Sequence, residues 1–310
     1  MTRLTGSVLV AVVLLTQACE RSFIPEIITD EEIVVEGYIE AGDQPTPPYV
    51  FLTRSLPFFT SLETDGLDAR FVRNAEVYVD NGSQRVQLSE VCLQELTPQQ
   101  QQLFARFVGL NPDSTNLNIC VYTDLQFRMV GEEGKTYELE VILEDNTSMI
   151  ASTTIPEHVS LDSLYFRQPP GEPSDTLAQL RVKIQDPGDK ADFYRYQTSI
   201  GDEPLLAPLG SVVNDELFNG QSFEFPLARA EPRGVEFDPT SFGLFRRGTE
   251  ATIKWMTIDK AQFEFWNTLE FSLANQGPFS SYTRVTSNVE GGLGLWGGIS
   301  ATYYELRVPE

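Results

Sequence analysis

Hydrophobic and polar residues alternate along much of the chain with the period of two that β-strands show. In residues 136–143 one tyrosine and three aliphatic residues share one face, while Glu138 and Glu140 lie on the other. This pattern predicts a half-buried antiparallel strand. A strand over residues 149–155 is predicted to pair with it across a turn at residues 145–146.

Other strand-like segments repeat this pattern on both sides of the chain's midpoint. Residues 75–80 and 85–88 flank Asn81-Gly82, a pair that favours a tight hairpin turn. Further strands are predicted over residues 33–39, 49–54, 127–130, 177–184, 193–200, 251–257 and 301–308. The chain is therefore predicted to be mainly β.

The hydrophobic period changes to that of a helix in two places. Thr97-Pro98 has the pattern of a helix start, and apolar residues then recur at helical spacing up to Gly109. Asp259 and Gln262 form a capping-box pattern ahead of an amphipathic stretch that ends near residue 273. We expect one short helix in each segment.

A length of 310 residues favours two domains. Pro156 and its neighbours have the composition of a boundary. We expect residues 33–156 to form an N-terminal β-sandwich with a helical insertion at residues 93–119. Residues 157–310 are predicted to form a second β-rich domain with one or two short helices.

The start of the chain has the pattern of a bacterial export signal. Residues 8–15 form an apolar run that is too short to span a bilayer, and Cys19 follows shortly after it. The segment resembles a lipobox, although Thr16 stands where leucine is usual. It predicts a signal peptide over residues 1–19, a lipid anchor on Cys19 and an acidic tether over residues 20–32. An ordinary signal peptide, or a buried strand with a chance cysteine, is the alternative.

Two cysteines remain when Cys19 is set aside as the lipid site. Cys92 and Cys120 flank the predicted helical insertion, and an even pair in an oxidising compartment favours one disulfide. Two free buried thiols are the alternative, because pairing geometry is not encoded in the spacing.

Catalytic and metal-binding patterns are weak in this chain. His158 is the sole histidine, no G-x-S-x-G motif is present, and an exposed or capping role suits this histidine best. Asp186, Asp189 and Asp192 offer oxygen ligands to calcium, but they lack a full ligand ladder and favour a turn. We therefore expect no enzyme activity, no metal and no cofactor.

The net charge of the chain disfavours one class of partner. The chain has 45 Asp and Glu against 22 Lys and Arg, a formal net charge of -23. Such a surface repels phosphate backbones, so we expect no nucleic-acid partner. With so many acids, close carboxylate pairs arise by chance, and a glycosidase pair needs geometry that the sequence does not give.

Aromatic residues near the C-terminus are candidates for contacts with a partner or ligand. Most are expected in the core, where large rings gain most from burial. Trp296 lies in the glycine-rich stretch 288–298, where its ring either fills the core or anchors a partner. Phe279 and Tyr282 are the other candidates that we retain.

Several segments, in order, resemble the Bacteroidota lipoprotein family known as domain of unknown function 4249. They are Cys19 with its tether, Ile33-Val-Val-Glu-Gly37, Leu52-Thr-Arg-Ser55, Phe193-Tyr-Arg195, Asp215-Glu-Leu-Phe-Asn-Gly220 and Ser287-Asn-Val-Glu-Gly-Gly292. The resemblance implies a cell-envelope protein whose gene neighbours often encode a TonB-dependent outer-membrane receptor. Residues 75–79 and 134–139 also resemble an immunoglobulin-like or carboxypeptidase-regulatory-like sandwich.

These observations together favour a binding protein over an enzyme. We expect an outer-membrane lipoprotein, on the cell surface or the periplasmic face, that assists a TonB-dependent receptor in capturing a peptide, glycan or other nutrient. An envelope hydrolase that uses a carboxylate pair, or a structural or adhesive surface protein, is the alternative.

Overall fold

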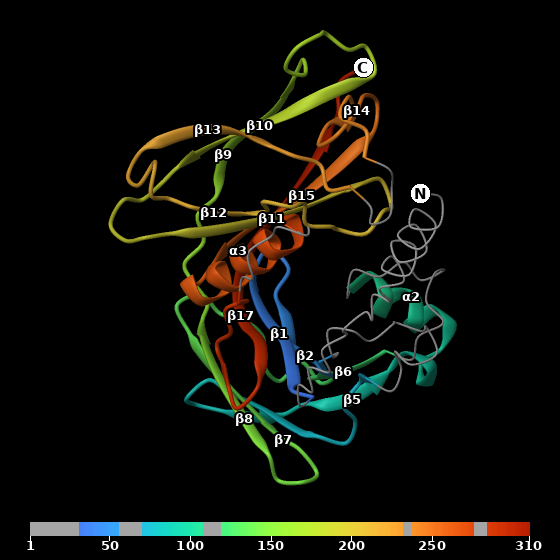
Figure 1. Cartoon of the computed structure of the whole chain (residues 1–310), viewed down its shortest axis with the longest axis vertical. Coiled ribbons are helices and arrows are strands. Elements are labelled where there is room, and N and C mark those ends of the chain that lie inside the picture. The colour runs from blue at the N-terminus through green and yellow to red at the C-terminus, as the bar shows by residue number, and fades with distance from the viewer. Residues whose placement is uncertain (1–30, 56–69, 108–118, 232–236, 276–283) are drawn as a thin grey trace, which may run out of the picture. The chain divides into compact units, whose positions relative to one another are not determined.

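Three β-sheets and two α-helices make up the described part of the chain, which confirms the mainly β prediction (Figure 1). The computed structural model describes residues 31–55, 70–107, 119–231, 237–275 and 284–310. The predicted signal peptide, Cys19, most of the tether, Phe279 and Tyr282 lie outside these ranges.

The largest sheet has eight strands and joins the two ends of the described chain. Its strand order is β12 (Val212–Asn214), β11 (Phe193–Ile200), β15 (Glu250–Ile258), β17 (Leu293–Arg307), β1 (Ile33–Gly42), β2 (Thr46–Arg54), β6 (Cys120–Thr123) and β5 (Ser89–Cys92). The central pair, β1 and β17, is parallel, and the other neighbours are antiparallel. A parallel pair between the first and last strands has no local sequence signal, because its partners are brought together by the whole fold.

The five-stranded sheet contains both hairpins that the sequence predicts. Its order is β16 (Val289–Glu290), β8 (Ser148–Thr154), β7 (Thr136–Ile142), β3 (Glu76–Asp80) and β4 (Arg85–Gln87). Along β7, Tyr137, Leu139 and Val141 are buried, while the alternate residues are more exposed. The period-two pattern therefore gives the correct face of this strand.

The remaining sheet is organised around one long strand, β10 (Leu177–Gln185). It pairs with β9 (Leu161–Arg167), β13 (Ser222–Leu227) and β14 (Phe245–Arg246). Alternate residues of β10 are fully buried, among them Leu180 and Val182.

Three hydrophobic clusters among the described residues use strands of the eight-stranded sheet, and two of them also contain residues of another sheet. One contains Val35 and Leu52 from that sheet together with Val79 and Leu139 of the five-stranded sheet. The other contains Tyr194 and Trp255 together with Leu180 and Phe245 of the four-stranded sheet. β17 contributes to both, through Trp296 in the first core and through Tyr304 and Leu306 at the edge of the second.

Both predicted helices are present. α3 (Lys260–Ala274) begins after Asp259, whose side chain accepts a hydrogen bond from the Gln262 amide, as the capping pattern predicts. Its Phe263 and Trp266 pack with Leu295 and Ile299 of β17. α2 (Pro98–Phe107) follows the short 3-10 helix η3 (Leu93–Glu95), and the Thr97 side chain caps its start.

One detail of the predicted strands is wrong. Residues 127–130 form an irregular segment, because Phe127 has a φ of 53° and the Met129 amide bonds the Asp124 carboxylate instead of a strand. The glycine-rich stretch 288–298 lies largely in strands β16 and β17, with a turn at Gly291 and Gly292. Gly294 there has a φ of 112°, and a Cβ atom would lie 1.9 Å from the Val35 carbonyl oxygen, so close backbone approach requires glycine.

The predicted boundary at residue 156 falls between β8 and β9. Strands from both sides of it share the eight-stranded sheet. The division into two domains therefore stays a prediction.

Candidate functional site

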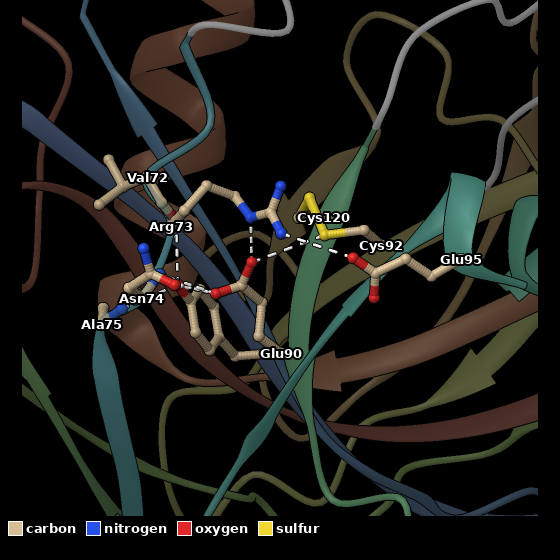
Figure 2. Close-up of polar contacts among 9 residues, drawn as sticks. Val72, Arg73, Asn74, Ala75, Glu90, Cys92, Glu95 and Cys120 are labelled. Atoms are coloured by element: carbon tan, nitrogen blue, oxygen red, sulfur yellow. Dashed lines mark hydrogen bonds and ion pairs between the residues drawn. A yellow bond between two sulfur atoms is a disulfide. The ribbon is translucent and has the colours of Figure 1, made fainter.

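One group of polar residues surrounds Glu90 at the edge of the eight-stranded sheet, and we call it the Glu90 cluster. The Glu90 carboxylate pairs with the Arg73 guanidinium and accepts hydrogen bonds from the Asn74 amide at 2.8 Å and the Tyr122 hydroxyl at 3.1 Å (Figure 2). Arg73 also pairs with Glu95 at 3.7 Å. Each negative charge in this group therefore faces a donor.

The pKa values in the Glu90 cluster follow from these contacts. Burial acts to raise the pKa of Glu90, but the hydrogen bonds from Asn74, Arg73 and Tyr122 outweigh it and lower that pKa. Burial, together with the charge of Glu90, raises the pKa of Tyr122 to about 12. The carboxylate is thus ionised and the phenol neutral near neutral pH, so neither group changes its charge there.

The Cys92–Cys120 disulfide borders the same group (Figure 2). The two cysteines lie directly opposite each other on β5 and β6, with their Cα atoms 4.0 Å apart. Glu90, Cys92 and Cys120 are close enough to suggest metal ligands. A disulfide sulfur has no thiolate to offer a metal, so we assign a structural role to the pair.

A hollow of about 400 Å³ lies on the outer face of the five-stranded sheet. Tyr78, Glu140 and Ile150 form a row across β3, β7 and β8, since each is directly opposite the next. Arg85, Asp80, Glu138 and Ser152 form the neighbouring row. Asn288 and Glu290 complete the rim.

The chemistry of this hollow is mixed and acidic. Arg85 lies over the Tyr78 ring, 4.3 Å from its centroid, and pairs with Glu140. Ile150 is 50% exposed, which leaves an apolar contact next to several carboxylates. The face can accept hydrogen bonds from hydroxyl, amide or cationic groups, and its net negative charge disfavours anionic ligands.

Three buried aspartates form a second acidic group, which we call the aspartate cluster. Asp186 follows β10, Asp192 precedes β11 and Asp215 follows β12. Their exposed fractions are 1%, 3% and 2%, and one carboxylate oxygen from each lies within 4.8 Å of the others. Asp189, which the sequence groups with the first two, is exposed on the intervening loop.

The structure gives each remaining sequence candidate a position. Trp296 is fully buried in the core, and its indole donates to the Tyr137 carbonyl oxygen at 2.9 Å. Of the two roles that the sequence leaves open, the structure thus places this ring in the core. His158 lies 2.8 Å from the Thr302 hydroxyl.

No local pattern in the sequence links the residues that the tertiary structure brings together in these groups. Asp215 joins Asp186 and Asp192 although it lies on a later loop. In the sequence, Tyr78 and Ile150 occupy ordinary alternating positions of two predicted strands. An aromatic and an aliphatic residue on the polar face of predicted strands are the signal in the sequence for this hollow.

Comparison with known proteins gives one family. The family model described as Domain of unknown function (DUF4249) matches residues 20–305. A search of curated proteins gives no match. Within the ranges that the structure describes, neither helix has the length and apolar character needed to cross a bilayer.

Proposed function

Because the chain belongs to the family of domain of unknown function 4249, we propose that it is a lipid-anchored envelope protein that binds a nutrient for an outer-membrane transporter. The predicted acylation of Cys19 supports the location. Several acyl chains hold a folded body at a membrane, since each buried methylene contributes about 0.8 kcal/mol. The predicted TonB-dependent receptor is the proposed partner.

The observation that carries the binding function is the hollow on the five-stranded sheet. Its volume of about 400 Å³ falls in the range of small-ligand sites. Tyr78 offers a ring face, Ile150 an apolar contact, and the surrounding carboxylates accept hydrogen bonds. A segment of peptide or glycan, neutral or cationic, suits this set of groups.

The transporter proposal is tested by purification of the native, full-length protein from membranes in mild detergent. We expect an outer-membrane transporter to accompany it at a fixed ratio. A Cys19→Ser variant should leave the membrane fraction, because it cannot be acylated. Recovery of the anchored protein without a transporter contradicts the partnership.

The ligand proposal is tested separately, with the hollow altered. Glycan and peptide arrays probed with the full chain should give binders that a Tyr78→Ala and Ile150→Ser variant loses by about tenfold or more. A matched control is Tyr165→Ala, since Tyr165 is exposed at 42% on β9, away from the five-stranded sheet. Equal binding by both variants contradicts a role for the hollow.

A second candidate is the envelope hydrolase, which one observation favours. Asp80 and Glu138 lie opposite each other on β3 and β7, and both line the hollow. A carboxylate pair of this kind is the catalytic unit of many glycosidases. If the hollow is catalytic, Glu138→Gln should abolish turnover of a bound glycan. If the hollow only binds, both the unmodified protein and the variant should bind the glycan without turning it over.

A further inference from the structure

The aspartate cluster gathers more negative charge than its surroundings compensate. Lys190 pairs with the Asp192 Oδ1 atom at 3.7 Å, and its side chain is 42% exposed. Three carboxylates against this one ammonium leave two formal negative charges. Burial and then the neighbouring Asp186 and Asp215 charges, against the opposing effect of Lys190, raise the pKa of Asp192 to about 6.

The carboxylates are held in place by donors on their outer sides. Asp186 accepts from the Tyr194 hydroxyl at 2.7 Å and the Gly220 amide at 2.9 Å. Asp215 accepts from the Asp192 amide and from the Asn219 side chain, each at 2.9 Å. The Asp192 Oδ2 atom, in contrast, is buried without any hydrogen-bond partner. A buried, unpartnered carboxylate oxygen is costly unless a ligand satisfies it.

We propose that the aspartate cluster is a Ca²⁺ site. Ca²⁺ binds oxygens at about 2.3–2.6 Å, so ligands on opposite sides of the ion lie roughly 5 Å apart. One oxygen from each of the three carboxylates lies within 4.8 Å of the others, so a single ion can reach all three. Mg²⁺ bonds are shorter, about 2.1 Å, and this ion prefers to keep its water shell. Water molecules would complete the Ca²⁺ shell.

The ion would join two loops that the chain separates. Residues 186–192 connect β10 to β11, and residues 215–221 connect β12 to β13. A Cβ atom on Gly188, whose φ is 79°, would lie 2.5 Å from the Gly220 Cα atom, so the loops already touch through their backbones. Bound Ca²⁺ would fix the second loop, which carries Leu217 at 86% exposure.

Thermal unfolding of the full chain tests the site, after treatment with a chelator and its removal. At Ca²⁺ concentrations about a hundred times the dissociation constant we expect the melting temperature to rise by roughly 5 °C. Asp192→Asn should lose this Ca²⁺-dependent rise. In chelated buffer it should melt no lower than the unmodified protein, because it removes a negative charge that the neighbouring carboxylates repel. Asp189→Asn, on the exposed part of the same loop, should keep most of the rise. An equal rise in Asp192→Asn overturns the proposal.

Two measurements on the unmodified chain need no variant. Equilibrium dialysis followed by metal analysis should give about one Ca²⁺ per chain at this site, with Mg²⁺ a weak competitor. Tb³⁺ should emit when the protein's aromatic rings are excited, because Tyr194 contacts Asp186 and stacks on Trp255 at 5.1 Å. Added Ca²⁺ should displace the Tb³⁺ ion and so remove that emission. Dialysis without retained Ca²⁺, or Tb³⁺ emission that Ca²⁺ leaves unchanged, overturns the proposal.

Discussion

The Glu90 cluster and the aspartate cluster are both acidic groups at the edges of strands, but they handle charge in opposite ways. Glu90 faces the Arg73 guanidinium and two further donors, and the pKa of its carboxyl is lowered. Asp192 is buried beside two other carboxylates, and burial together with their charges raises its pKa to about 6. A group of acidic residues is therefore a candidate ligand site where the fold provides too few cations and donors to pair with it. A carboxylate that is already paired has no free interaction to offer a ligand.

A disulfide reinforces the compensated region, and its removal should have the largest effect. Replacing Cys92 and Cys120 by serine opens a bridge with a sequence separation of 28 residues. We expect the free energy of unfolding to fall by about 3–4 kcal/mol in the loop-entropy model. Urea unfolding measures it, and a reducing agent should lower the unmodified protein to the same midpoint while leaving the variant unchanged. An unchanged midpoint in the variant would mean that the bridge contributes little.

Removing one carboxylate charge from each cluster compares them directly. Glu90→Gln should lower the free energy of unfolding by about 1–2 kcal/mol, since it weakens charged hydrogen bonds. Asp192→Asn should cause no loss in chelated buffer. The control is Glu95→Gln, because Glu95 pairs with the same arginine but its side chain is 65% exposed, and its loss should be under about 0.5 kcal/mol. Equal losses for Glu90→Gln and Asp192→Asn would refute the contrast.

The lowered pKa of Glu90 gives a pH dependence with a definite sign. A carboxyl whose pKa is lower when folded adds stability above its unfolded pKa, about 4.3, and this is lost as the pH falls through the folded value. The stability difference between the unmodified protein and Glu90→Gln should therefore shrink on acidification below about pH 4.3. Urea titrations at several pH values measure it. If this stability difference instead grows as the pH falls, the pKa of Glu90 is raised on folding and not lowered.

The smallest predicted effect concerns the Lys190 ammonium beside the aspartate cluster. Lys190→Gln should cost at most about 0.5 kcal/mol in chelated buffer, because its ion pair is partly exposed. It should also tighten Ca²⁺ binding a few-fold, since a competing positive charge is gone. Lys183→Gln, on an exposed position of the neighbouring strand β10, is the matched control. Weaker Ca²⁺ binding by Lys190→Gln would contradict the proposed site.

Local patterns predicted most of the elements correctly. The hairpin at Asn81 and Gly82, the alternating strand β7 and the capped helix α3 each depend on residues close together in the chain. The strand predicted over residues 127–130 is wrong because the backbone there bonds a side chain, Asp124, which a strand pattern does not register.

The candidate sites were harder to predict, for the same reason in each case. The sequence suggests Asp186 and Asp192 as calcium ligands but not Asp215, since nothing local links Asp215 to the other two. The hollow depends on a register that places Tyr78, Glu140 and Ile150 in one row across three strands. Spacing along the chain specifies the faces of strands, whereas neighbours across a sheet depend on pairing.

The sequence by itself determined the mainly β class, the helix starts, the envelope hypothesis and the order of segments typical of the family. Tertiary structure alone decided that β1 lies parallel to β17, that Trp296 fills a core, and that three distant aspartates share one buried space. Local preferences act over a few residues and can be read from the chain. Burial and charge compensation arise between segments far apart in sequence, so they exist only once the chain has folded.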